Sequence, residues 1–290
     1  MLFRSTDSRG ATPSKVLDAP ASISVVSSEK IANTVTPSMA GVLSTTPGLS
    51  ISQGGLVQSN IVSRGFNNAF SGAMLNLQDY RVLIIAVHPE YWSLKMYQQV
   101  RQWVQQTGGR LMYLGGNGLN CEVDLQADAM TVHNGNIQSL WPAGMNNCDS
   151  RFGMRHESEA SLLGVVFTPA GAMTGAPYRV EDESHWVFAG TGLRNGDLFG
   201  RECLHQRCPG GASGHETDKR SASSPPRTHL LARGTNPDDG GAEMVLLETD
   251  SGGAVFSVGS INYVASLPVD SQISAITANV LRRFLLDSVS

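Results

Sequence analysis

The sequence has few cysteines, no long apolar run and no basic excess, and each shortage excludes a class of protein. Four cysteines in 290 residues are too few for the disulfide framework of a small secreted scaffold. No apolar stretch approaches the ~20 residues of a membrane-spanning helix, and the first ten residues lack the apolar centre of an export signal. The net charge of -4 comes from interspersed charges, which argues against a nucleic-acid partner. We therefore expect a globular protein that stays in the cytoplasm.

Glycine, by contrast, is abundant. The chain has 31 glycines, several of them in adjacent pairs such as Gly115 and Gly116, and such pairs are typical of turns at the ends of helices and strands. Hydrophobic residues make up 41% and charged residues 16%, which is enough for one or two ordinary cores. Two unrelated patterns follow one another and meet near Asp79, so we expect two domains, residues 1–78 and residues 79–290.

The first domain alternates apolar and polar residues as half-buried strands do. Residues 22–26, 49–52 and 61–66 are the predicted strands, and short helices are expected to begin near Ser27 and Thr36. Three successive segments closely resemble the plug domain of TonB-dependent outer-membrane receptors, over residues 16–77: DAPASISVV, TTPGLSIS and SRGFNNAFSGAML. In that family the plug sits inside a β-barrel and gates nutrient uptake. A small α+β module without activity of its own is the alternative, because a barrel needs its closed sheet.

The second domain opens with a βαβ pattern. Residues 82–87 form an apolar run that fits a buried parallel strand, Ser93 is a helix N-cap, and residues 111–114 form the next strand. The apolar residues of the intervening helix fall on one face: Met96, Val100, Trp103 and Val104. Ligands of parallel sheets bind beyond the carboxyl ends of strands, so the loops at residues 88–91 and 115–118 should be neighbours. A dinucleotide loop is disfavoured, since GGNG lacks the required glycine spacing.

Long stretches of this domain closely resemble the C-terminal region of the large subunit of N,N-dimethylformamidase. They include VLIIAVHPEYWS, QWVQQTGGRLMYLGGNG, HWVFAGTGLRNGDLFG, GGASGHETDK and GGAVFSVGSINYVASL, and the resemblance covers residues 79–286. It implies an α/β fold with a parallel sheet, like that of class I glutamine amidotransferases (flavodoxin-like). It also implies an amide hydrolase that splits dimethylformamide into dimethylamine and formate, with a small second subunit.

The family's iron is held by two tyrosines and a glutamate, an oxygen set that suits a hard Lewis acid. The resemblance assigns Tyr91, in HPEYWS, as one tyrosine; a capping-loop tyrosine is the plainer alternative. The second tyrosine should come from upstream of this βαβ unit, where the sequence is plug-like instead. Tyr80 is available, but it lies at the opposite end of its strand from Tyr91. Glu159 is the glutamate that we select, with Glu157 as its rival and a solvated carboxylate as the alternative.

Carboxylates in GHETD supply candidate acid–base groups. We expect Glu216 to act as a general base for water, and Asp218 is its candidate partner, although aspartate in such text more often caps a turn. His88 can serve the site or merely bond to backbone. Cys203, His205, Cys208 and His215 could hold zinc, but C-x-H-x2-C is irregular for a structural site, so a loop disulfide or plain packing remains an alternative.

The carboxyl-terminal region reads as scaffold. The pattern of residues 273–286 predicts an amphipathic helix that buries Ile276, Val280, Leu281 and Phe284. Asp270 or Ser271 is expected to start the helical region. A hydrolase domain without its first strand and helix should also leave an exposed sheet edge.

Three hypotheses follow for function. The first is iron-assisted hydrolysis of a small amide, impaired by truncation, with a small subunit or a second copy of the chain as partner. The second is a receptor-plug fragment, which alone would place the protein at the outer membrane. The third is an inactive fusion of the two halves.

Overall fold

A computed structural model describes residues 2–4, 49–53, 59–63, 77–125, 130–133 and 152–286. Contacts divide the chain into two units: Thr6–Ser71, and a larger unit of Met1–Ser5 with Gly72–Ser290. The predicted boundary between residues 78 and 79 stays a prediction.

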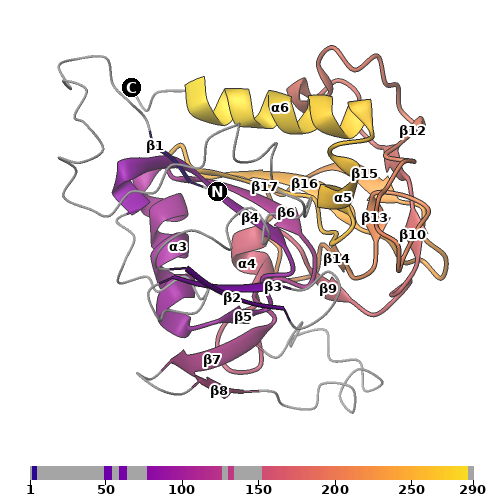
Figure 1. The fold of residues 1–290 in the computed structure, drawn as a ribbon. Coiled ribbons are helices and arrows are strands. Elements are labelled where there is room, and N and C mark those ends of the chain that lie inside the picture. The colour runs from indigo at the N-terminus through magenta and orange to yellow at the C-terminus, as the bar shows by residue number, and fades with distance from the viewer. Residues whose placement is uncertain are drawn as a thin grey trace. The chain divides into compact units, whose positions relative to one another are not determined.

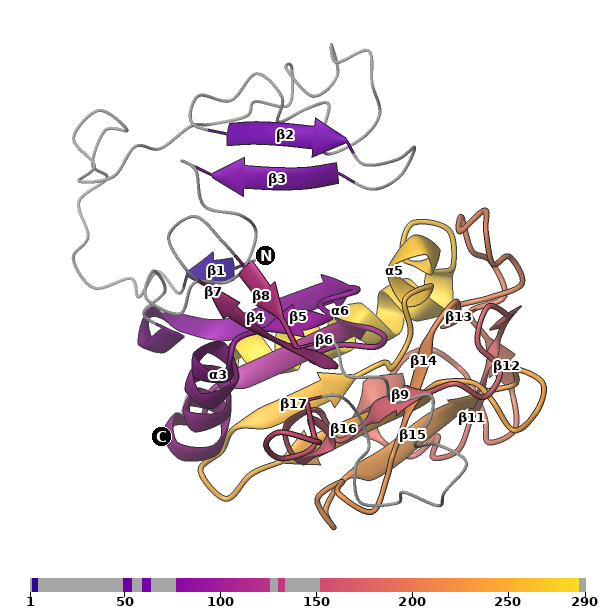
Figure 2. The same cartoon turned by 90° about the horizontal axis from the view of Figure 1, so that it is seen from below.

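The larger unit is built on an eight-stranded sheet in the order β1-β4-β6-β17-β16-β15-β11-β12 (Figure 1), and Figure 2 shows β4 to β11 side by side. In this order the strands are Leu2–Arg4, Tyr80–Val87, Arg110–Gly115, Ala254–Ser257, Glu243–Glu248, His229–Gly234, Tyr178–Val180 and Leu198–Phe199. The expected parallel arrangement holds for β4, β6 and β17, whereas the other neighbouring pairs are antiparallel. The connections from β15 to β17 are too short for the crossover of about a dozen residues that parallel strands need.

Helices cover both faces of this sheet. In Figure 1, α6 (Ser271–Leu286) runs along one face, and α3 (Leu94–Thr107) and α4 (Ala160–Leu163) lie on the opposite side. Alternate residues of the central strands therefore face different helices, so Met112 and Phe256 belong to the core cluster that includes α6. Three further short helices are η2 (Leu77–Asp79), η5 (Trp186–Phe188) and α5 (Tyr263–Ser266). The result is a layered, mixed α/β unit.

The predicted βαβ unit is confirmed. The hydroxyl of Ser93 accepts a hydrogen bond from the backbone N of Met96 (3.2 Å), which makes it the N-cap of α3. All four predicted apolar positions of the helix are buried. Gly108 ends the helix with φ 77°, a left-handed conformation that glycine adopts without a Cβ penalty.

The predicted carboxyl-terminal helix is also confirmed, with one correction. Asp270 Oδ1 accepts from the backbone N atoms of Gln272 and Ile273 (both 3.1 Å), so Asp270 caps its first turn. Ile276, Val280 and Phe284 are buried as predicted. Leu281 is only partly buried, and Ile273 is buried in addition, because the stripe facing the sheet is centred nearer Ile273 than predicted.

Arginines from the sheet hold the other end of α6. Arg81 donates to the backbone oxygen of Leu285 (2.8 Å), and the buried Arg110 donates to that of Phe284 (2.9 Å). Cations at a helix carboxyl end satisfy its last carbonyls and oppose its dipole. These two contacts fix α6 against the amino ends of β4 and β6.

Several small strands surround the carboxyl ends of β4 and β6. They form a three-stranded sheet and two two-stranded ones: β5 (Tyr91–Trp92), β7 (Cys121–Leu125) and β8 (Met130–Val132); β9 (Val166–Thr168) with β14 (Thr217–Lys219); and β10 (Gly175–Ala176) with β13 (Ser213–Gly214). An isolated bridge joins Thr217 to Ser260, which lies after β17. Through this bridge the strand β14 is attached next to the parallel strands.

The smaller unit contains an antiparallel pair, β2 (Leu49–Gln53) and β3 (Ser59–Ser63), at two of the three strand positions predicted from the plug-like text. The predicted strand at 22–26, the helices near Ser27 and Thr36, and residues 64–66 lie outside the described residues. In the larger unit, β1 pairs with β4 over three residues, so the expected exposed edge is covered at that point.

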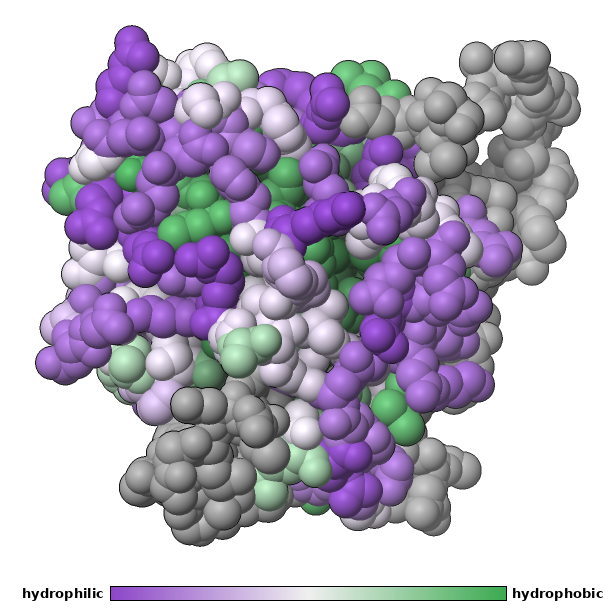
Figure 3. Space-filling view, turned by 180° about the vertical axis from the view of Figure 1, so that it is seen from behind, coloured by the Kyte–Doolittle hydropathy of each residue, from purple (hydrophilic) through white to green (hydrophobic). Residues whose placement is uncertain are grey.

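The surface carries apolar residues in separate places. Figure 3 shows one face on which polar side chains surround smaller apolar areas. Among exposed large hydrophobic residues are Leu204, at 60% exposure, and Val87 and Tyr91 near the end of β4. Within the ranges given above, no helix is both long and apolar enough to span a membrane.

Candidate functional site

Three chain segments meet beyond the carboxyl ends of β4 and β6. They bring together His88 after β4, Asn117 after β6 and Glu216 before β14. The backbone N of Gly116 donates to the oxygen of Val87 (3.1 Å), and that of Leu119 donates to the oxygen of Pro89 (2.9 Å). The two loops predicted to be neighbours are therefore neighbours.

Gly116 is needed because the backbones approach each other closely. A Cβ at this position would overlap the backbone oxygen of Glu216 and lie 2.9 Å from the backbone N of Ile261. Gly115 is similarly restricted, since its Cβ would lie 2.7 Å from the oxygen of Val87. Both glycines thus permit close packing.

Side chains of these segments form a hydrogen-bonded cluster. Glu216 Oε2 accepts from Asn117 Nδ2 (2.8 Å) and lies 3.2 Å from His88 Nε2. His88 Nε2 is also 3.3 Å from Glu90 Oε2 and 3.3 Å from Asn117 Nδ2. The alternative that His88 serves only backbone is therefore wrong: its ring faces carboxylates from two segments.

Electrostatics favours the charged form of both members of the His88–Glu216 pair. The hydrogen bond from His88 lowers the pKa of Glu216, with Asn117 contributing and burial opposing. Burial alone would lower the pKa of His88, but the hydrogen bond and charge of Glu216, with the charge of Glu90, raise it overall. Their side chains are 34% and 26% exposed, so water reaches them. The pair combines an ionised carboxylate with an imidazole that holds its proton more strongly than usual.

Asp218 lies below this pair and is 1% exposed. Its Oδ2 accepts from the hydroxyl of Tyr113 (2.7 Å) and its Oδ1 from the backbone N of Asn117 (2.7 Å). The same Tyr113 hydroxyl accepts from the backbone N of Gly118 (2.7 Å). Burial raises the pKa of Asp218 to about 7, although these hydrogen bonds oppose the shift. Asp218 is thus a strand residue that anchors the glycine-rich loop, and the turn-cap interpretation is wrong.

Backbone strain is concentrated at the same place. Val87, Asn117 and His215 have φ values of 70°, 49° and 65°, in the left-handed region that non-glycine residues avoid. Val87 immediately precedes His88, and His215 immediately precedes Glu216. Such strain persists only where surrounding contacts enforce it, and it is common at functional sites.

The two predicted iron ligands differ in environment. Tyr91 lies on β5 and is 46% exposed. Glu159 is fully buried at the start of α4, where its charge acts on the phenols of Tyr97 and Tyr113. The rival Glu157 pairs with Arg101 (2.9 Å) at the surface, as a solvated carboxylate would.

Tyr80 does not complete the set. It begins β4, and a strand rising ~3.3 Å per residue carries it far from the end where Tyr91 lies. Tyr91 and Glu159 therefore stay the two predicted ligands, and Tyr80 is not the third. Their oxygen donors suit iron, but two ligands are fewer than the three that the resemblance implies.

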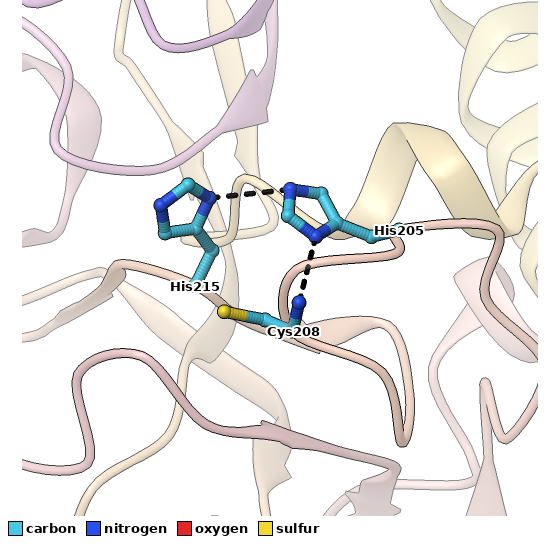
Figure 4. A group of neighbouring side chains, drawn as sticks. All are labelled: His205, Cys208 and His215. Atoms are coloured by element: carbon cyan, nitrogen blue, oxygen red, sulfur yellow. Dashed lines mark hydrogen bonds between the residues drawn. The ribbon is translucent and has the colours of Figure 1, made fainter. Parts of the chain in front are cut away.

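A second group of side chains lies in the segment between β12 and β14. Potential ligand atoms of His205, Cys208 and His215 all lie within 4.8 Å of one another (Figure 4). Burial lowers the pKa of both imidazoles, so both favour the neutral form. Cys203, the fourth member predicted from sequence, instead places its Sγ 3.7 Å from the oxygen of Asn262. Cys121, Cys203 and Cys208 are free thiols, so the loop-disulfide alternative is wrong, and Cys148 lies outside the described residues.

A polar cavity of about 300 Å³ lies on the other side of β14, lined by Arg179, Lys219 and Arg233 among others. Its cations are paired, since Arg233 lies 3.2 Å from Glu243 and Lys219 lies 3.4 Å from Asp239. This pairing disfavours an anion site.

The sequence predicted Glu216 and Asp218 as site residues, but it did not predict two of the residues that form hydrogen bonds with them. Tyr113, on β6, donates to Asp218, and Asn117, in the loop after β6, donates to Glu216. The signal available in sequence was the polar Asn117 among glycines after a buried strand.

Comparisons with known proteins decide the family. The family model described as N,N-dimethylformamidase beta subunit-like, C-terminal, matches residues 67–276, which is more than half of the chain. The chain belongs to this family. The cluster of His88, Asn117 and Glu216 lies within the matched part of this dimethylformamidase-like chain.

Two curated relatives agree with that assignment. The N,N-dimethylformamidase beta subunits of Paracoccus aminophilus and of an Alcaligenes species are each 26% identical over 259 residues. The match covers 73% of the dimethylformamidase-like chain but only 33% of each relative, so the chain spans about a third of their length. A second family model, the TonB-dependent Receptor Plug Domain, matches residues 15–84 and overlaps the first over residues 67–84. Both resemblances identified in the sequence are confirmed.

Proposed function

We propose that the chain hydrolyses the C–N bond of a small amide at the cluster of His88, Asn117 and Glu216. The observation that carries this proposal is the His88–Glu216 pair, an ionised carboxylate 3.2 Å from a proton-holding imidazole, in a chain of the dimethylformamidase family. Amide hydrolysis needs a base for the attacking water and an acid for the departing amine. The pair supplies one of each.

In the proposed reaction, the Glu216 carboxylate takes a proton from a water molecule, and the oxygen of that water attacks the carbonyl carbon of the amide. The C–N bond then breaks, and the imidazolium of His88 gives its proton to the nitrogen, which leaves as an amine. The carboxylic acid product loses a proton, and the protons held by the pair return to their starting positions. Asn117 orients Glu216 through its amide, and Asp218 is a positioning residue that fixes the loop carrying Asn117.

Tyr91 and Glu159 remain our proposed iron ligands. Their oxygen donors suit a hard cation, and the missing tyrosine leads us to expect weaker iron binding and impaired turnover. Elemental analysis of the purified chain tests this part separately. Iron that falls in both Tyr91→Phe and Glu159→Gln supports it, and iron content unchanged in both variants contradicts it.

We extend the proposal to fold and assembly. The parallel trio β4, β6 and β17, with α3 connecting the first two, supports a glutamine-amidotransferase-like ancestry for residues 79–290. Both relatives are named as beta subunits, which supports a second subunit, or a second copy of this chain, as partner. Size measurement of the chain with and without a co-expressed small subunit tests the assembly.

The decisive experiment is amine release from small formamides by the purified chain. We expect Glu216→Gln to lower kcat by roughly 10²–10⁴-fold, because a carboxamide keeps the shape but cannot accept the proton. Glu157→Gln is the matched control, since Glu157 pairs with Arg101 away from the cluster. Turnover that survives in Glu216→Gln refutes the assigned base. No turnover in the unaltered chain refutes the activity and favours an inactive fusion.

The plug-family match at residues 15–84 favours one other candidate, a receptor-plug fragment at the outer membrane. Cell fractionation distinguishes the two functions. Recovery with cytoplasmic proteins supports the hydrolase, whereas recovery with the outer membrane supports the plug fragment.

A further inference from the structure

The group formed by His205, Cys208 and His215 has the composition of a soft-metal site. Two imidazole nitrogens and one thiol sulfur lie within 4.8 Å of one another. In a tetrahedral zinc site with bonds of about 2.0–2.3 Å, neighbouring donors lie roughly 3.3–3.8 Å apart. Each pair therefore needs to close by roughly 1–1.5 Å at most, which side-chain rotation within a loop can supply.

The backbone that carries these donors is held in place. The buried side chain of Asn262 donates to the backbone oxygens of Cys208 (2.8 Å) and Gly211 (3.0 Å). His215, in its left-handed conformation, donates to the oxygen of Thr174 (3.0 Å) and accepts from the backbone N of Met173 (2.6 Å). These contacts enforce the strained backbone that aims the His215 ring at His205 (Figure 4).

The two imidazoles already share one hydrogen. His205 Nε2 lies 3.2 Å from His215 Nδ1, while His205 Nδ1 accepts from the backbone N of Cys208 (3.1 Å). An ion that binds His205 Nε2 takes the place of that shared hydrogen, which moves to Nδ1 of the same ring; the hydrogen bond from the backbone N of Cys208 to Nδ1 is then broken, and the ring rotates away from it. The thiol of Cys208 releases its proton to solvent and binds as thiolate. Both His205 and His215 are partly exposed, so water can reach the ion.

We propose that His205, Cys208 and His215 bind one zinc ion, with a fourth position open to water or a small ligand. Nitrogen and thiolate donors suit zinc, whereas an oxygen set suits the iron implied by the family. Three protein ligands with an open position are the arrangement of reactive zinc sites. This site uses other side chains than the His88–Glu216 pair, although His215 immediately precedes Glu216, and it does not rest on amide hydrolysis.

The test is zinc binding by the full purified chain. Metal is removed with a chelator, zinc is added, and the zinc retained after buffer exchange is measured together with Kd by chelator competition. We expect about one zinc per chain, and an affinity at least ~100-fold lower in Cys208→Ser. Cobalt in place of zinc should give a thiolate-to-metal charge-transfer absorption that Cys208→Ser abolishes.

Cys203→Ser is the matched control, because Cys203 lies in the same loop but outside the group of ligand atoms. Its Sγ lies 3.7 Å from the oxygen of Asn262 and accepts from the backbone N of His205 (3.4 Å), and a serine hydroxyl can also accept there. This variant should retain zinc affinity and the cobalt absorption. Because Cys208 is buried, the more exposed His205→Ala provides a second variant that must also lose zinc while keeping the circular dichroism of the folded chain. Less than half a zinc per chain, or equal loss in Cys203→Ser and Cys208→Ser, overturns the proposal.

Discussion

Replacing Asp218 with asparagine should change how the stability of the protein depends on pH. Burial raises the pKa of Asp218 from 3.8 to about 7, so the folded chain binds a proton that the unfolded chain releases. A carboxyl with a raised folded pKa contributes stability that is fully present below the unfolded pKa. That contribution is lost as pH rises toward the folded pKa. Asparagine has no such proton and removes this dependence.

The size follows from the shift. Each pKa unit corresponds to ~1.4 kcal/mol, so the unfolding free energy should lose on the order of 3 kcal/mol from this group between pH 5 and 8. In Asp218→Asn the side-chain oxygen still accepts from Asn117, but the amide meets the Tyr113 hydroxyl as a donor. That mismatch costs about 1–2 kcal/mol at every pH. The variant should therefore be less stable at pH 5 and recover relative to the unaltered chain by pH 8.

Urea unfolding followed by tryptophan fluorescence measures this, since Trp92 and Trp103 are buried. The quantity of interest is the difference in unfolding free energy between variant and unaltered chain at each pH. Asp239→Asn, at a fully exposed carboxylate, is the matched control. A difference for Asp218→Asn that stays constant from pH 5 to 8 would refute the reasoning.

Three further predictions follow. Gly116→Ala should lower the unfolding free energy by about 1–3 kcal/mol in urea and reduce amide turnover, because the new Cβ overlaps the backbone of Glu216; unchanged values would contradict the close approach. Turnover should fall at acid pH as Glu216 gains a proton, at a pH below the usual glutamate range. It should fall at alkaline pH above the usual histidine range, and a pH–rate profile of His88→Gln should lack the alkaline limb. Phe256→Ala should cost about 3–5 kcal/mol in urea unfolding, against less than about 0.5 kcal/mol for the exposed Leu204→Ala; equal costs would contradict the assigned core.

Local patterns in the sequence were enough to predict several elements. The apolar run before His88, the serine cap at Ser93 and the glycine pair beginning at Gly108 predict a strand, a helix and its end, because each depends on residues within one or two turns. The general rule for parallel strands also predicts that the loops after β4 and β6 are neighbours, and they are.

Patterns were less reliable where distant parts of the chain set the environment. The expected parallel sheet ends at β17, because the connections between β15, β16 and β17 are too short for the crossovers that parallel strands need. The turn-cap alternative for Asp218 was wrong because its hydrogen-bond partners Tyr113 and Asn117 lie about a hundred residues away in the sequence. Sequence spacing likewise grouped Cys203 with three other ligands, whereas the fold leaves its Sγ outside their ligand atoms, in contact with the oxygen of Asn262 and the backbone N of His205.

The sequence alone determined the family, the βαβ unit and the residue types available for acid–base or metal chemistry, since each of these depends on short, continuous segments of the chain. Only the tertiary structure decided which of those residues act together. Gly116 lets the backbone of Glu216 approach. The hydrogen bond from His88 lowers the pKa of Glu216 against the effect of burial, whereas burial raises the pKa of Asp218 to about 7. The distances between these side chains and their desolvation arise only when the chain folds, so residue spacing along the sequence does not predict them.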